Sequence, residues 1–267
     1  MGHDALSIRM KSYYEHRSRH YLSRRIPVII RLDGKAFHTF TKGFKKPYDE
    51  LLHKTMNDTM RYLCENIQGC KLGYTQSDEI TLLLTDYDTL TTDAWFDYNI
   101  QKVCSIAASM ATMAFNRYFR INFNLADFGD NLDYTKILYN KLDSAMFDAR
   151  CFNIPKEEVT NCFIWRQQDA TRNAIQMLGQ AYFSHNELQN KNNSDIQDML
   201  MQQKGINFND MPTEFKRGVC CYKTTVEYDG IDMNTNEEGC YERSVWMLDY
   251  NIPIFTQDRN YVERYVG

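Results

Sequence analysis

Proline is scarce in this chain, with 5 residues in 267, and the sequence contains no internal repeat and no low-complexity tract. A long proline-rich linker is therefore excluded. Hydrophobic residues make up 43% of the chain and charged residues 25%, which is the composition of a folded protein rather than a disordered one. A chain of this length can bury a sizeable core as one large domain, or as a core with a substantial appendage.

Long hydrophobic runs are also missing. No stretch approaches the length of a membrane span, the first residues lack the apolar region of a secretion signal, and Leu6 stands where a myristoylation signal requires Ser or Thr. The 8 cysteines form no CxxC pair and have no histidines at zinc-finger spacing, so we interpret them as buried thiols of a reducing compartment. We expect a soluble, cytoplasmic protein with no membrane partner.

The chain has no excess of basic residues either, because its formal net charge is -4. This charge argues against wholesale coating of nucleic acid, although it leaves room for a local basic face. One candidate face is residues 6–22, where apolar and aromatic residues at spacings of three and four predict a basic amphipathic helix.

The first half of the chain alternates strand and helix patterns in the order β-α-β-β-α-β. The patterns cover residues 27–34, 48–67, 70–87 (two β-rich runs around a polar tip), 95–119 and 145–155. This order predicts a ferredoxin-like fold of the α+β class, in which the third strand returns by a hairpin between the first two. The tip of the first strand, Asp33, then lies beside the start of the third strand, Asp78 and Glu79.

After Pro155 the pattern changes. Residues 156–183 and 195–205 read as helices, and residues 218–230 and 240–251 read as two strands of a hairpin around "NTNEEG". We therefore divide the chain into a palm-like catalytic region, 1–155, and a helical and β C-terminal region, 156–267, that packs on the palm as one unit.

The converging acids suggest a metal site. Mg²⁺ prefers oxygen ligands, usually one or two carboxylates together with substrate phosphate oxygens, and Asp33, Asp78 and Glu79 fit that need as catalytic residues. Gly34 would allow a backbone carbonyl or a phosphate to approach closely. The alternative is that each acid is a strand-end residue whose oxygens are satisfied by neighbouring amides.

The residues around these acids suit a nucleoside triphosphate. Successive backbone N–H groups after Gly34 could surround phosphates, Ser77 could donate its hydroxyl, and nearby lysines could neutralise charge. "LDGKAFH" lacks the Walker pattern, which excludes P-loop chemistry. His38 reads either as a general base or as a packed or phosphate-contacting residue. Two rivals remain open: a palm-type nucleotide cyclase, and a non-catalytic RNA-binding module on a ferredoxin-like sheet.

"RLDGKAFHTF", "KPYD" and "GYTQSDE", followed in order by "WFDYNIQK", "MFDAR", "WRQQDATRN" and "NDMPTEFKRG", resemble the signature stretches of the tRNA(His) guanylyltransferases and their Thg1-like relatives. These enzymes extend RNA in the 3′-to-5′ direction. The resemblance runs from about residue 5 to about residue 220 and implies a polymerase-type palm, a nucleotidyltransferase activity, tRNA as partner and a homotetramer.

The resemblance also assigns roles to residues. It implies that Asp33, the Gly34 carbonyl and Asp78 bind two Mg²⁺ ions, with Glu79 in support. ATP and GTP or other NTPs would be substrates, and the residues implied to hold a triphosphate are Lys35, Ala36, Phe37, His38, Lys46, Asp49, Ser77 and Lys102. The residues implied to lie towards RNA are Arg150, Arg166, Asn173 and Lys191.

One stretch departs from the family pattern. Members that read the anticodon of tRNA(His) carry "HINNLYN" after the WRQ-x-D motif, whereas Thr171 to Met177 here reads "TRNAIQM", and only Asn173 matches. This departure favours template-dependent repair of 5′-truncated tRNA, in which base pairing supplies the specificity. The alternative is addition of a guanylate to tRNA(His).

Overall fold

The computed structural model of the protein describes residues 4–231 and 238–267. Within these ranges a 6-stranded sheet has the order β4-β1-β3-β2-β5-β6. All neighbouring strands are antiparallel. The strands are β1 (Val28–Gly34), β2 (Cys70–Gln76), β3 (Glu79–Leu84), β4 (Phe147–Asn153), β5 (Val219–Ile231) and β6 (Glu238–Asp249).

The register of the inner strands confirms the ferredoxin-like prediction. β3 lies between β1 and β2, and Asp33 at the end of β1 faces Glu79 on β3 and Asp148 on β4. Three acidic residues from three strands therefore stand side by side at one end of the sheet. Because side chains alternate between the two faces of a strand, paired positions point to the same face.

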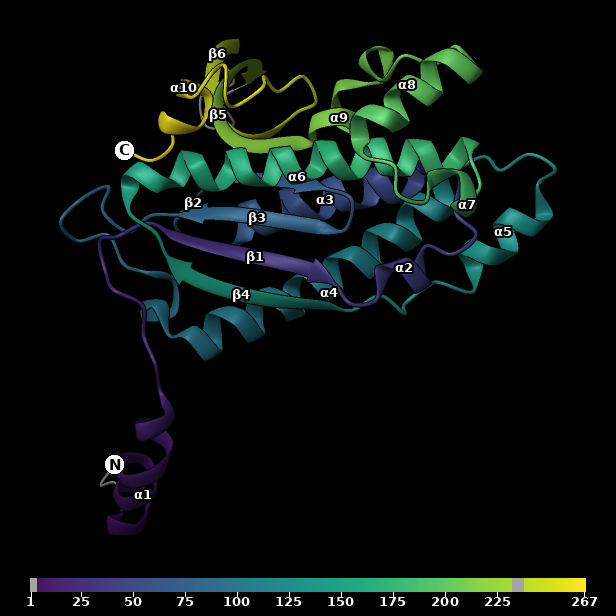
Figure 1. Cartoon of the computed structure of the whole chain (residues 1–267). Helices are drawn as coiled ribbons and strands as arrows, with labels where there is room; N and C mark the ends of the chain where they lie inside the picture. Colours follow the sequence, from purple (N-terminus) through teal and green to yellow (C-terminus); the bar gives the residue numbers. More distant parts are fainter. Residues whose placement is uncertain (1–3, 232–237) are drawn as a thin grey trace.

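Helices cover both faces of this sheet (Figure 1). Helices α3 (Glu50–Asn66) and α4 (Ile100–Leu125) pack on one face against Val28, Ile30 and Leu32 of β1, all of which are buried. Helix α6 (Lys156–Tyr182) crosses the other face and packs on Ile29 and Leu83. Asp33 shares the strand face of Ile29, so the acidic end of the sheet opens on the α6 side.

The C-terminal half shares the sheet instead of standing apart from it. β5 pairs with β2 through Leu72↔Tyr222 to Thr75↔Val219. The second half of α6 forms a separate apolar cluster with α8 (Asn193–Lys204) and α9 (Thr213–Arg217), and the short α7 (His185–Leu188) and α10 (Asn260–Glu263) complete the helices of this half. The β-hairpin prediction is confirmed for β5 and β6, whereas most of "NTNEEG" lies outside the described residues.

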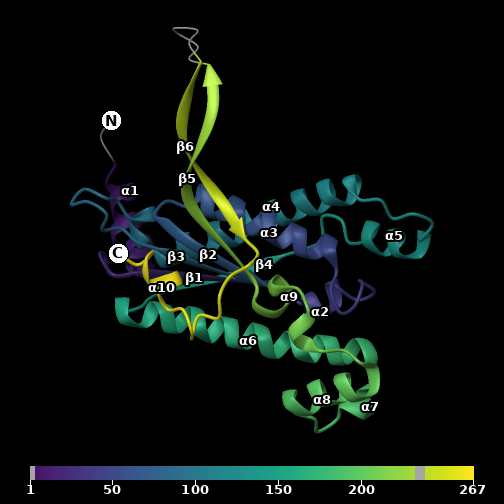
Figure 2. The ribbon, with the colours of Figure 1, turned by 90° about the horizontal axis from the view of Figure 1, so that it is seen from above.

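Two segments project from this body. Beyond its pairing with β2, the β5–β6 hairpin continues outward as an arm (Figure 2). The N-terminal segment also stands away from the sheet, with α1 (Ala5–Met10) followed by a π-helical turn (Lys11–Glu15) and a 3₁₀ turn (His16–Ser18), none of which buries a residue (Figure 1). Among the described residues, no helix is long and apolar enough to cross a membrane.

Two predicted helices have other bounds in the structure. The helical segment predicted over residues 6–22 ends at Ser18. The predicted helix 95–119 begins only at Ile100, because Asn99 caps it through the backbone N–H of Lys102, and it continues to Leu125. The residues before it form a separate turn in which Phe96, Asp97 and Tyr98 all have φ between 51° and 54°. Short helices α2 (Phe37–Phe40) and α5 (Leu132–Tyr139) lie in segments for which no element was predicted.

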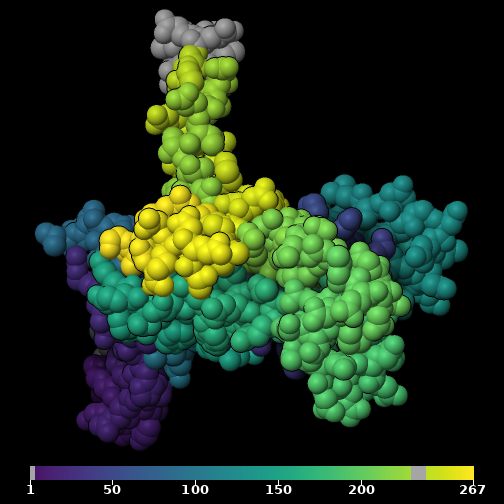
Figure 3. All heavy atoms as spheres, turned by 45° about the horizontal axis from the view of Figure 1, so that its top comes forward, coloured from purple at the N-terminus to yellow at the C-terminus, as the bar shows by residue number. Residues whose placement is uncertain are grey.

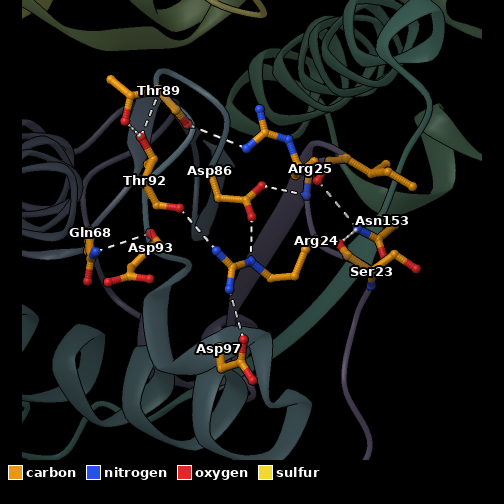
Figure 4. A network of polar contacts seen from close by, with 11 residues as sticks. Ser23, Arg24, Arg25, Gln68, Asp86, Thr89, Thr92, Asp93, Asp97 and Asn153 are labelled. Atoms are coloured by element: carbon orange, nitrogen blue, oxygen red, sulfur yellow. Dashed lines mark hydrogen bonds and ion pairs between the residues drawn. The ribbon is translucent and has the colours of Figure 1, made fainter.

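A polar network holds this left-handed turn at the sheet end opposite the acids (Figure 4). The Arg24 guanidinium binds the buried carboxylate of Asp86 at 2.6 Å and that of Asp97 at 3.0 Å. Arg24 also donates to the Thr92 carbonyl at 3.0 Å. Because left-handed backbone is unfavourable for residues other than glycine, such a turn persists only where surrounding contacts fix it, and this network supplies them.

Candidate active site

Two carboxylates meet where β1 ends and β2 turns into β3. Asp33 is the second-last residue of β1, and Asp78 lies in the β2–β3 turn after Ser77, whose φ is 55°. The backbone N–H of Gly34 donates to the Asp78 carbonyl at 3.1 Å, which ties the two strand ends together. The predicted meeting of residues separated by 45 positions is therefore present in the structure.

The segment after Asp33 is anchored by aromatic packing. An added Cβ at Gly34 would lie 2.3 Å from the Phe37 ring, so only glycine fits there. Phe37 stacks on Phe40 with 4.9 Å between ring centroids and packs edge-on against Phe115. Ala36 has φ 53° and starts the short α2. This packing turns the backbone of residues 34–38 along the edge of a cleft.

The cleft has a volume of about 600 Å³, which is in the range of small-molecule sites. It is lined by Asp33, Gly34, Ala36, Phe37, His38, Thr41, Lys42, Gly43, Lys46, Leu52, Ser77, Asp78, Met177 and Gln180. Eight of these are residues predicted from the sequence to bind metal or triphosphate. A carboxylate pair thus stands at one side of a cleft that also carries two lysines and a histidine.

Neither Asp33 nor Asp78 forms an ion pair with a described residue, whereas Glu79 binds Arg31 at 3.1 Å and Arg166 at 3.3 Å. Arg150 attracts Asp33 from beyond ion-pair distance. Burial raises the pKa of Asp78 to about 6, and the charges of Asp33 and Glu79 add to this effect, although a hydrogen bond from Ser77 opposes it. Such a site favours a bound cation.

The donor set fits Mg²⁺. Asp33 and Asp78 offer carboxylate oxygens and Gly34 a carbonyl oxygen, and Mg²⁺ sites in proteins commonly use one or two carboxylates and leave further positions to substrate and water. Within the described ranges, no three His, Cys, Asp or Glu side chains converge as a ready-made metal cage. The fit therefore rests on two carboxylates and leaves room for phosphate oxygens.

Arg166 connects the acids to α6. Its side chain is 5% exposed, binds Glu79 and Asp169, and lies over the Trp165 ring at 4.2 Å from the centroid. Burial alone would raise the pKa of Asp169, but hydrogen bonds from Arg172 and Arg166 outweigh this effect and lower the pKa. Arg166 is therefore buried and paired within the fold, while Asn173 is exposed beside Ser77 and Asp78 in an adjoining pocket.

Several predicted residues do not line the cleft. Asp49 is 6% exposed, and its carboxylate accepts hydrogen bonds from Leu52 N–H at 3.1 Å, Lys45 N–H at 3.0 Å and the Tyr134 hydroxyl at 2.5 Å. It therefore caps α3. Lys35 is exposed, and its N–H is bound to the Met146 carbonyl at 2.9 Å.

Three further predicted residues lie elsewhere. Lys102 is at the start of α4, near the left-handed turn, because the Ile100 N–H binds the His20 carbonyl ahead of β1. The structure thus places it at the end of the sheet opposite Asp33. Arg150 is exposed on the edge strand β4 and pairs with Asp148 at 3.0 Å, and Lys191 is exposed in the loop between α7 and α8.

Sequence reasoning missed other parts of the site. The segment between the motifs "RLDGKAFHTF" and "KPYD" contains three further lining residues, Thr41, Lys42 and Gly43. Their place between two recognised motifs could have indicated that they belong to the site. Met177 and Gln180, at a spacing of three on α6, reach the same cleft, and only the docking of α6 reveals this. Next to the cleft, the rings of Tyr48 and His53 are 4.8 Å apart, and burial lowers the pKa of His53 to about 4.

A ferredoxin-like sheet that brings two carboxylates to a cleft with lysine, histidine and hydroxyl groups is the arrangement expected of palm-type nucleotidyltransferases. The comparisons agree. A family model described as Thg1, tRNAHis guanylyltransferase, matches residues 7–155. The chain belongs to this family, whose members are nucleotidyltransferases, and this confirms the predicted enzyme class.

Relatives and solved structures support this membership over most of the chain. The chain is 30% identical to uncharacterized protein R259 of Acanthamoeba polyphaga mimivirus, over 76% of this chain and 72% of that protein. It is 27% identical to tRNA(His) guanylyltransferase of Debaryomyces hansenii, over 81% of each. A bacterial Thg1-like protein in complex with ATP is 43% identical, with a TM-score of 0.82 and coverage of 98% of this chain and 99% of that one.

The same type of bacterial protein has been solved in complex with GTP, at 42% identity and a TM-score of 0.76, covering 98% of this chain and 99% of that one. tRNA(His) guanylyltransferase from Saccharomyces cerevisiae, at 21% identity and a TM-score of 0.63, shares the fold and covers 92% of this chain and 99% of its own.

Proposed function

We propose that this enzyme adds nucleotides to the 5′ end of tRNA in the 3′-to-5′ direction and repairs 5′-truncated tRNA against the opposite strand. The observation that carries the proposal is the pair Asp33 and Asp78 at the edge of a cleft with Lys42, Lys46 and His38. The likeness to bacterial proteins solved with ATP and with GTP supports nucleoside triphosphates as the ligands of this cleft.

The proposed reaction has two steps. An oxygen of the RNA 5′-monophosphate attacks the α-phosphorus of ATP and releases pyrophosphate, which leaves an adenylylated RNA end. The 3′-hydroxyl of an incoming nucleotide then attacks the RNA 5′-phosphorus and releases AMP. Both steps displace a phosphate-containing group, so one set of residues can serve both.

Each part of the cleft has a task in this scheme. Asp33, Asp78 and the Gly34 carbonyl would hold two Mg²⁺ ions, which would supply charge stabilisation to the reacting phosphates. Lys46, Lys42, His38 and Ser77 bind the triphosphate, and the backbone from Gly34 to His38 orients it. Glu79, fixed by Arg31 and Arg166, keeps the end of β3 in register with Asp33.

A second candidate function is addition of a guanylate to tRNA(His). It is favoured by the names of several relatives at 24–27% identity, such as those of Dictyostelium discoideum and Debaryomyces hansenii. The stretch Thr171 to Met177 weighs against it, because it reads "TRNAIQM" where members that read the anticodon of tRNA(His) carry "HINNLYN", and only Asn173 matches.

The expected assembly is a homotetramer, and the expected location is the cytoplasm. The arm formed by β5 and β6 supports an oligomer, because an isolated two-stranded hairpin is marginally stable in water and gains stability by packing against another chain.

An extension assay tests the proposal. The enzyme is given Mg²⁺, ATP and the four NTPs, with either 5′-monophosphorylated tRNA lacking its first nucleotide or intact tRNA(His). We expect templated extension of several truncated tRNAs and little addition to intact tRNA(His). Selective guanylate addition to tRNA(His) would establish the second candidate instead. Turnover of ATP or GTP without an RNA product would point to a cyclase-type palm enzyme.

A further inference from the structure

A second cleft lies on the other side of α6 from the carboxylates. It has a volume of about 460 Å³ and lies between α6, the segment around α9 and the C-terminal segment at Ile254 and Thr256. Figure 3 shows these last two segments, in green and yellow, side by side along α6. All charged residues that line this cleft are basic: Arg172, Lys216 and Arg217.

Two side chains of α6 fix the walls of this cleft. Gln167, which is 5% exposed, donates to the Pro253 carbonyl at 2.9 Å and accepts from the Phe255 N–H at 2.8 Å. The Thr171 hydroxyl donates to the Lys216 carbonyl at 2.9 Å, which ties α9 to α6. The three basic residues therefore stand on a rigid frame rather than on a loose loop.

The chain compensates these charges poorly. In the described part of the chain, Lys216 and Arg217 form no ion pair: Lys216 donates to the Asn209 carbonyl and Arg217 to the Ile252 carbonyl at 3.4 Å. Burial and the neighbouring Arg217 charge lower the pKa of Lys216, although Asp210 opposes this. Among the residues that the structure describes, Arg172 forms an ion pair with Asp169 alone, and Asp169 also pairs with Arg166. The three positive charges repel one another, and an anion bound in the cleft would reduce this repulsion.

The other lining groups describe the anion. Gln168, Thr256 and Asn209 contribute amide and hydroxyl groups, and the aromatic ring of Phe208 is buried at 6% exposure. A base would need an exposed ring to stack on, whereas a phosphate needs only cations and hydrogen-bond donors. The cleft thus suits a phosphate that is recognised without its base.

The position of the cleft relates it to the carboxylates. One side of α6 lines the pocket next to Asp78, with Arg166, Asp169 and Asn173. The opposite side of the same helix lines the basic cleft, with Gln167, Gln168, Thr171 and Arg172. The two sites are therefore separated by the width of one helix, roughly 10 Å. A polynucleotide whose 5′ end reaches Asp33 and Asp78 can lie across α6 with its backbone at the basic cleft.

We propose that the cleft of Arg172, Lys216 and Arg217 binds a backbone phosphate of the RNA substrate, independently of base identity. This inference rests on the proposed function for its ligand. It assigns the "KRG" segment, whose Lys216 and Arg217 touch neither the carboxylates nor the nucleotide cleft, to holding RNA.

The test measures binding of a 5′-monophosphorylated hairpin RNA by fluorescence anisotropy across a series of salt concentrations. In the double variant Lys216→Gln with Arg217→Gln, the slope of log affinity against log salt should fall by roughly one for each phosphate that the variant no longer binds. Affinity should fall equally for hairpins of different sequence, and ATP binding should remain that of the wild type.

Two variants serve as controls. Lys54→Gln removes an exposed lysine on α3, across the sheet from the cleft, and should keep the wild-type slope. Lys216→Arg preserves the charge and should retain the slope as well. If thermal unfolding shows that the double variant is not folded, Arg172→Gln replaces it, because Arg172 is exposed and its loss removes one surface ion pair.

The outcomes separate this inference from the proposed function. Wild-type slope in the folded variants, alongside normal nucleotide addition by the wild type, would overturn the phosphate site alone. A reduced slope in a protein that adds no nucleotides would overturn the proposed reaction and retain the site. Weaker ATP binding in the variants, or displacement of RNA by inorganic phosphate at constant ionic strength, would assign the cleft to free phosphate compounds and overturn the RNA assignment. Absence of RNA binding by the wild type would overturn both.

Discussion

At the level of single residues, Glu79 and the two aspartates of the site, Asp33 and Asp78, have different surroundings. Glu79 is held between Arg31 and Arg166, while Asp33 and Asp78 form no ion pair with a described residue. The charge of Glu79 is therefore compensated within the fold. The charges of the two aspartates remain available to bind a cation, which in turn can bind a phosphorylated substrate.

The first prediction concerns Asp78. We expect Asp78→Asn to lower nucleotide addition on the order of 100-fold or more, because an amide binds Mg²⁺ far more weakly than a carboxylate. The fold should be retained, since Gly34 donates to the backbone carbonyl of residue 78 and not to its side chain. Single-turnover addition assays and urea unfolding measure the two effects. Asp198→Asn, at an exposed position on α8, is the matched control; equal activity in the two variants would contradict the role of Asp78.

His53 gives a prediction about pH. Burial lowers its pKa to about 4, so it stays neutral in the folded protein and takes up a proton in the unfolded chain near its ordinary pKa of 6.5. This group therefore contributes stability above pH 6.5 that is lost as the pH falls towards 4, by at most about 3 kcal/mol. His53→Leu should lack this loss. Urea unfolding of both proteins near pH 7 and near pH 4 measures it, and parallel pH profiles would contradict it.

The site residues show what sequence can and cannot reveal. Asp33 and Asp78 could be paired from strand order alone, because the antiparallel hairpin fixes which strand ends meet. Asp49 was predicted to bind triphosphate, yet an aspartate directly before a helix also reads as its cap, and the structure shows the cap. The same strand order bears on Lys102, because α4 follows β3, and β3 runs from Glu79 beside Asp33 to Leu84 at the opposite end of the sheet.

At the level of elements, the turn from Gly34 to Phe40 couples the core to the cleft. Gly34→Ala should destabilise the protein by about 1–3 kcal/mol, because its Cβ would collide with the Phe37 ring. We expect a larger effect on ATP affinity than on RNA affinity, since the displaced backbone lines the nucleotide cleft. Thermal unfolding and ATP titration test this. Adding Phe37→Leu should make room and restore part of both losses; if it worsens them, the collision is not the cause.

Some helices and strands could be predicted from the sequence, and others could not. The strands and long helices of the first half follow from alternation and helical spacing over many residues. The short α2 and α5 offer too few residues for such a pattern. The pairing of β5 with β2 links Leu72 to Tyr222 across most of the chain, and no local signal marks it. The hairpin was recognised from sequence, whereas its place in the sheet was not.

At the level of the whole molecule, two projecting segments have little contact with their own chain. The N-terminal segment exposes Leu6, Ile8, Tyr13 and Tyr14, each more than half exposed, and buries none of its residues. The arm beyond Tyr222 is a two-stranded ribbon (Figure 2). Short helices and isolated hairpins are marginal in water, so both segments would gain stability from a neighbouring chain.

The last prediction removes the arm without disturbing the sheet. Because Lys223 pairs with Trp246, residues 224–245 can be replaced by an Asn-Gly turn, which suits a two-residue hairpin loop, while Trp246 and Leu248 keep their packing on the core. If the arm joins subunits, light scattering after size exclusion should show a smaller assembly than the wild type. Thermal unfolding of the dilute protein should change little, since the arm lies outside the hydrophobic clusters. An unchanged mass would show that the arm does not join subunits, and the exposed N-terminal segment would then be the surface to alter next.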